Sequence, residues 1–200
     1  MTRARKRGGT ALLLVDYINP LDFGGGDSLA PFALHAARRT AALKRRAKAE
    51  RLPVIYANDN FGRWRSEFSK LVRDCETSSA KGRELVELLR PQADDLSILK
   101  PRHSAFYGTP LEFLLDELRI TRLVLTGLAA DICILFTAHD AYLRKYDLWI
   151  PADCVASEKD GLRKEALRHM HSILRASVAQ STAWRAHLVP DSDNPKVRTR

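Results

Sequence analysis

The stretch RLVLTGLAADIC, residues 122–133, predicts a strand that runs into the first turn of a helix. Residues 122–126 form a short, mostly apolar run of strand length. A helix is expected over residues 131–145, because Asp131 is a residue type favoured at a helix N-cap. The stretch therefore predicts one strand–helix unit with a cysteine, Cys133, close to the turn between its two parts.

Similar units recur on both sides of this stretch. Apolar runs predict further strands at residues 11–15, 53–57, 97–99 and 148–150, with a candidate sixth at 177–179. Amphipathic stretches predict helices at residues 31–51, 109–118 and 161–174, and two more pieces within 63–95. Strands that alternate with helices indicate βαβ units and a parallel sheet. The expected fold class is α/β: a Rossmann-like, three-layer α/β/α sandwich around a mostly parallel sheet of five or six strands.

Length and composition limit the alternatives. The 200 residues favour one domain, expected over residues 10–189 between a basic, flexible N-terminus at 1–9 and a tail at 190–200. A hydrophobic fraction of 45% with 28% charged residues excludes a wholly disordered chain. No apolar run approaches the ~20 residues of a membrane span, and we expect no secretory signal peptide. Three cysteines, an odd number, exclude a disulfide framework, so a cytoplasmic protein without membrane contact is expected.

The net charge raises the question of a nucleic-acid partner. Lys and Arg number 33 against 24 Asp and Glu, a formal charge of +9. The positive residues concentrate at 3–7, 38–51 and 196–200, without a helix-turn-helix, zinc-finger or aromatic RNA-binding signature. A solvated basic helix face with two basic tails is the simpler interpretation. Nucleic-acid binding and a non-catalytic scaffold on the same fold stay as alternatives.

Three chemically reactive residues lie where predicted strands end. Asp16 follows the first strand, Lys100 the third and Cys133 the fourth. The carboxyl ends of parallel strands share one edge of a sheet, where ligands bind. A helix start and a nearby ammonium are both expected to lower the pKa of the Cys133 thiol, and a carboxylate such as Asp16 can exchange its proton. Cys75 and Cys154 have no comparable position and are interpreted as small core residues.

Four segments together resemble a known family of enzymes. They are ALLLVDYINPLDF at 11–23, VIYANDNFGRW at 54–64, ILKPRHSAFYGTPLEFLL at 98–115 and LVLTGLAADICILFTAHDAYLRKYDLWIPADCVAS at 123–157. In this order they resemble the isochorismatase-like cysteine hydrolases, which include nicotinamidases and N-carbamoylsarcosine amidohydrolases. The resemblance extends from residue 11 to about residue 178. The family's fold, a three-layer α/β sandwich, agrees with the fold class above.

The resemblance implies a catalytic triad and a covalent mechanism. Asp16 would be the general acid and base, and Cys133 would be the nucleophile. Lys100 would hold the aspartate and the thiolate in place and stabilise their negative charge. A cis peptide is implied at Leu128–Ala129, and the N–H groups of Ala129 and Cys133 would form the oxyanion hole. The implied reaction is hydrolysis of a small amide, imide or carbamoyl compound through a thioester, with water as second substrate. The family also implies a homodimer or homotetramer.

Two comparisons within the family bear on the reaction. Ala130 stands where many members have threonine, so a hydroxyl near the turn is missing. Isochorismatases proper cleave a vinyl ether and lack the nucleophilic cysteine. The presence of Cys133 therefore favours C–N cleavage, with vinyl-ether hydrolysis as the alternative.

The histidine pattern argues against a metal enzyme. Metal-binding nicotinamidases carry Asp-x-His after the second strand, whereas here Asp59 is followed by Asn60 and Phe61. His169 and His171 are two apart on a predicted helix and point to different faces, so they are not expected to form a ligand pair. We therefore expect no metal and no cofactor.

Residues near the predicted strand ends are candidates for substrate binding. Asn58, Asp59 and Asn60 lie at the end of the second strand, where they either form an Asx-turn loop or contact the substrate. Aromatic residues of nearby loops either line the pocket or pack the loops down: Phe23, Trp64, Phe106 and Tyr107. His103 lies close to the third strand, and its role, solvated, structural or in the site, stays open.

Overall fold

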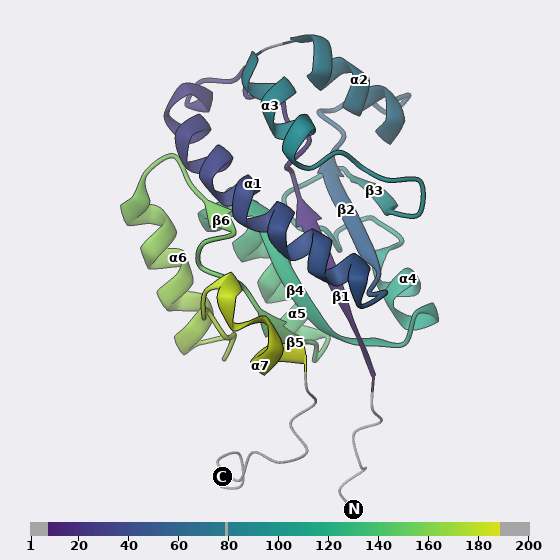
Figure 1. Cartoon of the computed structure of the whole chain (residues 1–200), viewed down its shortest axis with the longest axis vertical. Helices are drawn as coiled ribbons and strands as arrows, with labels where there is room; N and C mark the ends of the chain where they lie inside the picture. Colours follow the sequence, from purple (N-terminus) through teal and green to yellow (C-terminus); the bar gives the residue numbers. More distant parts are fainter. Residues whose placement is uncertain (1–7, 79, 189–200) are drawn as a thin grey trace, which may run out of the picture.

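Six parallel strands form the centre of the chain, which a computed structural model describes over residues 8–78 and 80–188 (Figure 1). The strands are β1 (Gly9–Val15), β2 (Val54–Asp59), β3 (Leu96–Lys100), β4 (Ile120–Leu128), β5 (Asp147–Trp149) and β6 (Val155–Ala156). Their order is β3-β2-β1-β4-β5, and β6 pairs with the carboxyl end of β4. Every pairing between these strands is parallel. The predicted α/β class with a mostly parallel sheet is confirmed.

Helices cover both faces of the sheet (Figure 1). They are α1 (Gly26–Ala49), α2 (Phe68–Ser78), α3 (Ala80–Leu88), α4 (Leu111–Glu117), α5 (Leu135–Leu143), α6 (Asp160–Ser172) and α7 (Trp184–Leu188). Residues of α1, α2, α3 and α7 belong to the hydrophobic core on one face, and residues of α4, α5 and α6 to the core on the other. The arrangement is therefore the expected α/β/α sandwich.

The β1 strand lies in the middle of the sheet and is buried on both faces. Leu12 and Leu14 belong to the core that α1 covers, whereas Leu13 and Val15 belong to the core that α4, α5 and α6 cover. All four side chains are fully buried. Since alternate side chains of a strand point to opposite faces, a continuous apolar run is what a central parallel strand requires.

The first helix is longer than predicted. The α1 helix begins at Gly26 rather than at Pro31, which lies inside it. A proline has no N–H and costs the helix one hydrogen bond. The burial of Leu29 and Ala33 against the sheet offsets this cost. The proline by itself predicts a helix start and gives no sign of this burial.

The sixth strand lies elsewhere than predicted. The candidate strand at 177–179 is reduced to a single bridge between Ser177 and Trp149. The sixth strand is β6, which pairs with Gly127 and Leu128 at the end of β4. The β6 strand has only two residues, and a hydrophobic pattern of that length is too short to predict a strand from the sequence.

Parts of the predicted organisation lie outside the described residues. Residues 1–7 of the predicted flexible N-terminus lie outside the described residues, and so does all of the predicted tail at 190–200. Within residues 8–78 and 80–188, no helix is long and apolar enough to cross a bilayer. The single domain over residues 10–189 and the homodimer or homotetramer stay predictions.

The strand order reverses beside β1, and this point positions the site. From β1 the chain adds β2 and β3 on one side, and then returns to place β4 on the other. Ligands of open α/β sheets bind at the carboxyl ends of the strands at such a point. Gly127 in β4 has a φ of 140°, and a Cβ on it would lie 2.1 Å from the carbonyl oxygen of Val15. Glycine therefore allows the ends of β1 and β4 to approach this closely.

We expect Gly127→Ala to lower the free energy of unfolding by more than about 1 kcal/mol, because the methyl group meets the Val15 carbonyl and alanine is strained at this φ. Gly161→Ala is the matched control, since Gly161 lies in α6 and a Cβ there meets nothing within 4 Å. Denaturant unfolding of both variants measures the difference. Equal stability of the two variants would contradict the close approach of the strands.

Candidate active site

Asp16, Lys100 and Cys133 meet at the carboxyl edge of the sheet. Asp16 follows β1, Lys100 ends β3, and Cys133 lies in a π-helical turn, Ala130–Ile134, that follows β4. Lys100 Nζ lies 2.9 Å from Asp16 Oδ2 and 3.6 Å from Cys133 Sγ. The fold thus brings together three residues that lie at separate strand ends in the sequence.

The two carboxylate oxygens of Asp16 have different partners. Oδ2 pairs with Lys100, and Oδ1 accepts a hydrogen bond of 2.7 Å from the main-chain N–H of Asp59. Asp16 has a φ of 53°, in the left-handed region that Asp adopts more readily than most residues. The chain turns sharply here, and the carboxylate is held against the ends of β2 and β3.

The Lys100 ammonium is buried and surrounded by acceptors. In addition to Asp16, it lies 3.6 Å from Asp59 Oδ2 and donates a hydrogen bond of 3.2 Å to the main-chain oxygen of Arg102. Burial disfavours the ammonium, but the charges of Asp16, Cys133 and Asp59 together outweigh that effect and raise the pKa of Lys100 above its ordinary value. The lysine is therefore a fixed positive charge between the carboxylates and the thiol.

The turn that carries Cys133 differs from the predicted helix start. The Leu128–Ala129 peptide bond is cis, as the resemblance implies. The N-cap residue is Ala129, which makes no side-chain capping bond. Asp131 lies inside the turn, where its carboxylate accepts a hydrogen bond from the hydroxyl of Ser157. The prediction of an Asp131 cap is wrong, because this carboxylate anchors the turn to the segment after β6 instead.

The pKa of the Cys133 thiol is raised, which corrects the expectation of a lowered one. Burial favours the neutral thiol, the negative charge of Asp16 acts in the same direction, and Lys100 opposes them without outweighing them. Burial also raises the pKa of Asp16, against the attraction of Lys100. The thiol therefore keeps its proton until a neighbouring base accepts it, and Asp16 is the carboxylate placed to do so.

His103 and Phe136 lie beside the thiol. Nδ1 of His103 is 3.9 Å from Cys133 Sγ, and the His103 and Phe136 ring centroids are 5.5 Å apart. Both side chains are exposed, and Phe136 packs on the ring of the histidine that contacts the sulfur. Sequence reasoning left His103 open and missed Phe136. The available signal was the position of Phe136, three residues after the cysteine, which is about one helical turn.

Asn58 and Asn60 support loops next to the site. Asn58 is fully buried, and its amide donates a hydrogen bond of 2.8 Å to the main-chain oxygen of Ile18. Its Oδ1 has no hydrogen-bond partner among the described residues. Asn60 Oδ1 accepts from the N–H of Gly62, which is the expected Asx turn. Both asparagines thus hold the loops that follow β1 and β2.

Asp59 belongs to the site as well as to its loop. Its Oδ1 accepts a hydrogen bond from the N–H of Phe61, as an Asx turn requires. Its Oδ2 lies 3.6 Å from Lys100 Nζ, and 29% of the side chain is exposed. Asp59 therefore presents a carboxylate both to the buried lysine and to the open side of the site.

The four aromatic residues expected at the pocket have different surroundings. Phe23, Trp64 and Tyr107 are exposed. Phe106 is buried in the core that α4, α5 and α6 cover, with its ring centroid 5.9 Å from that of Tyr146. Of the two roles that the sequence left open for Phe106, this burial supports packing of its loop onto the sheet.

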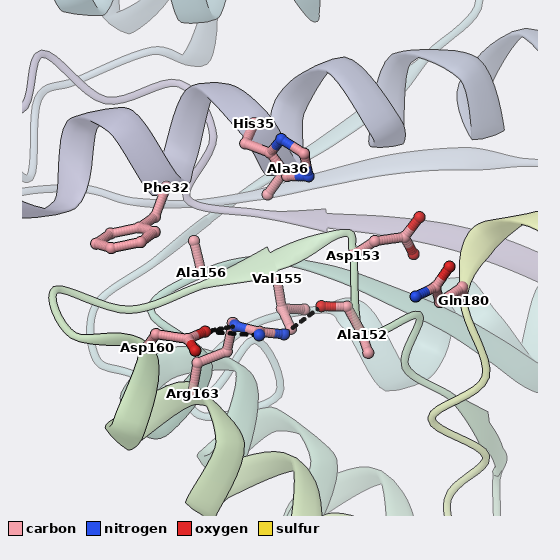
Figure 2. Close-up of a pocket in the computed structure, with 10 residues that line it drawn as sticks. All are labelled: Phe32, His35, Ala36, Ala152, Asp153, Val155, Ala156, Asp160, Arg163 and Gln180. Atoms are coloured by element: carbon pink, nitrogen blue, oxygen red, sulfur yellow. Dashed lines mark hydrogen bonds and ion pairs between the residues drawn. The ribbon is translucent and has the colours of Figure 1, made fainter.

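A separate cavity of about 370 Å³ lies between α1 and α6, on the β6 side of the sheet (Figure 2). Phe32 and His35 line it from α1, and Arg163 from α6. The guanidinium of Arg163 donates to the Asp160 carboxylate and to the main-chain oxygen of Ala152, so its charge is paired within the fold. The lining includes none of Asp16, Lys100 and Cys133, and the cavity is therefore distinct from the candidate active site.

We expect an alkylating agent to modify Cys133 alone in the folded protein. The three thiols differ in access: Cys133 is partly exposed, whereas Cys75 and Cys154 are buried. Iodoacetamide labelling followed by peptide mass spectrometry measures the modified fraction of each cysteine. Labelling in denaturant is the control, in which all three should react. Equal labelling of the three thiols in the folded protein would contradict the geometry.

Comparison with known proteins finds relatives over most of the chain. A family model, the Isochorismatase domain, matches residues 10–184. The isochorismatase family protein YaaI of Bacillus subtilis is 38% identical over 168 residues, which are 84% of this chain and 92% of that protein. Ureidoacrylate amidohydrolase RutB of Methylorubrum extorquens is 35% identical over 108 residues, 54% of this chain and 43% of that protein.

A solved structure agrees in fold as well as in sequence. N-carbamoylsarcosine amidase from Thermoplasma acidophilum has a TM-score of 0.68 and 30% identity to this chain. The match covers 86% of this chain and 96% of that one. With the fold, the three strand-end residues and the family model in agreement, the chain belongs to the isochorismatase family.

Proposed function

We propose that this chain is a cysteine hydrolase that cleaves a C–N bond in a small amide, imide or carbamoyl compound. The observation that carries the proposal is the position of Lys100 Nζ, 2.9 Å from the Asp16 carboxylate and 3.6 Å from the Cys133 thiol. A proton acceptor, a cation and a nucleophile at these distances are the components of covalent catalysis with general acid–base assistance.

In the first half of the proposed reaction, Asp16 takes the proton of the Cys133 thiol while the sulfur attacks the substrate carbonyl carbon. The carbonyl oxygen becomes an oxyanion, for which the N–H groups of Ala129 and Cys133 are the proposed donors. Asp16 then gives its proton to the nitrogen and the C–N bond breaks. Ammonia or an amine leaves, and the acyl group stays on the sulfur as a thioester.

In the second half, Asp16 accepts a proton from water, whose oxygen attacks the thioester carbon. The C–S bond breaks, the acid is released, and the proton returns to the sulfur of Cys133. The raised pKa values of both groups suit this exchange, because burial disfavours a state in which carboxylate and thiolate are both charged. The Lys100 ammonium stays charged throughout and limits the cost of the remaining negative charge.

Two relatives support a C–N substrate. The relatives matched in sequence and in structure include an amidohydrolase and an amidase, acting on ureidoacrylate and N-carbamoylsarcosine by name. Vinyl-ether hydrolysis is the alternative within the family. The nucleophile at Cys133 favours C–N cleavage over it, because cleavage of a vinyl ether does not need an acyl-enzyme thioester.

Contacts of α1 weaken the alternative of a nucleic-acid partner. Lys44 and Lys48 both pair with Asp95, at 2.6 Å and 2.8 Å. Arg38 pairs with Glu84 at 2.6 Å. Binding to nucleic acid draws on cations that are free to neutralise phosphates. The basic stretch of α1 therefore offers less charge to a partner than its composition indicates.

We expect Cys133→Ala, Asp16→Asn and Lys100→Met each to lower kcat by about 10²–10⁴-fold or more, because they remove the nucleophile, the proton acceptor and the fixed cation. The measurement is ammonia release from a panel of small amides, imides, ureides and carbamoyl compounds, with circular dichroism to check folding. Cys75→Ala removes a thiol outside the triad and should retain activity. Full activity of Cys133→Ala, or no turnover of any C–N compound by the unmodified protein, would sink the proposal.

The pH profile of kcat/KM is expected to have an acid limb above pH 3.8 and an alkaline limb above pH 9.0, the ordinary pKa values of Asp and Cys. Activity falls as the pH drops through the raised pKa of Asp16, because a protonated carboxyl cannot accept the thiol proton. It falls again at high pH, where Cys133 loses to solvent the proton that the leaving nitrogen needs. Initial rates across this range locate both limbs. An alkaline limb below pH 9.0 would contradict the raised pKa of the thiol, and a rate that rises as the thiol ionises would contradict the proton transfer.

A further inference from the structure

Two histidines of neighbouring helices face each other outside the triad. His139 lies in α5, and His169 lies in the last turn of α6. Their Nε2 atoms are 3.0 Å apart, and their ring centroids are 5.1 Å apart. The sequence did not reveal this pair, because the two residues are 30 positions apart and the only spacing it offered was that of His169 and His171. The pair has no part in the proposed reaction.

The spacing of the two nitrogens is that of two ligands on one metal ion. An imidazole nitrogen binds a divalent ion such as Zn²⁺ at about 2.0–2.1 Å, so two ligands at neighbouring positions lie about 3.0–3.4 Å apart. Core residues hold both helices beside the histidines, Ala138 and Ala141 in α5, Ala166 and Met170 in α6. The packing of the helices therefore places the two histidines side by side, within reach of one ion.

We propose that His139 and His169 form a bidentate site for a divalent transition-metal ion of the class of Zn²⁺, Ni²⁺ and Cu²⁺. Imidazole nitrogen is a preferred ligand of these ions. Within residues 8–78 and 80–188, no cluster of three or more His, Cys, Asp or Glu suits a metal. The two imidazoles therefore hold the ion by themselves, and water fills its remaining positions.

Binding of an ion requires one proton of the histidine pair to move. In the ion-free form one ring carries its proton on Nε2 and donates it to the other Nε2. When an ion binds, that proton moves to Nδ1 of its own ring, and both Nε2 atoms offer a lone pair.

An ion at this site joins two helices that the chain otherwise connects through β5 and β6. The α5 helix continues directly from the π-helical turn that carries Cys133. Because the second histidine binds as part of the same molecule, the pair holds an ion far more tightly than one imidazole does. Loss of either ligand is expected to weaken binding by about 10²-fold or more.

The test is calorimetric titration of the folded Cys133→Ser protein with Zn²⁺ and, separately, with Ni²⁺. The serine removes the thiol beside His103, which otherwise competes for these ions. We expect one ion per chain, and an affinity weakened by about 10²-fold or more when His139→Gln or His169→Gln is added. The ion should also raise the Tm of the Cys133→Ser protein and leave the Tm of both added variants unchanged.

The matched control is His35→Gln in the same background. His35 is an exposed histidine on α1, and its loss should leave ion affinity unchanged. Electron paramagnetic resonance of the Cu²⁺-loaded Cys133→Ser protein gives a second readout that does not depend on the folding of a histidine variant. Two imidazole nitrogens on the copper support the site, and one or none overturns it. Equal ion affinity of the His139→Gln, His169→Gln and His35→Gln proteins also overturns it.

Discussion

The buried positive charge of Lys100 is the interaction on which the candidate site depends. An ammonium without exposed surface costs several kcal/mol to desolvate unless negative groups surround it. Asp16 at 2.9 Å and Asp59 at 3.6 Å supply that charge, and they tie the end of β3 to the ends of β1 and β2. The same ammonium lies 3.6 Å from Cys133 in the turn after β4. One cation thus fixes four segments relative to one another.

The charges around this lysine also decide where the reactive proton resides. Two carboxylates already lie beside one ammonium, so a thiolate at Cys133 would add a further negative charge in a buried place. The thiol pKa is therefore raised, although the cysteine lies in a turn that begins a helix. Chemistry at such a site proceeds by transfer of the thiol proton to Asp16 rather than from a standing thiolate.

Sequence patterns predicted the fold best where one physical effect dominates. The apolar run of β1 needs burial on both faces, and no other arrangement of a short continuous run competes with that. The predictions were wrong where effects compete. Burial keeps Pro31 inside α1 despite the lost hydrogen bond, and Ser157 draws Asp131 away from a capping role.

The sequence by itself determined the class of fold, the family, and the three residues at the strand ends. The reason is that hydrophobic periodicity, turn residues and motifs are each patterns of a few neighbouring positions. Tertiary structure alone decided the distances among Asp16, Lys100 and Cys133, the raised pKa of the thiol, and the meeting of His139 with His169. Desolvation and Coulomb interaction set these features. Both depend on groups that are distant in the chain and become neighbours only when the sheet and its two helix layers assemble.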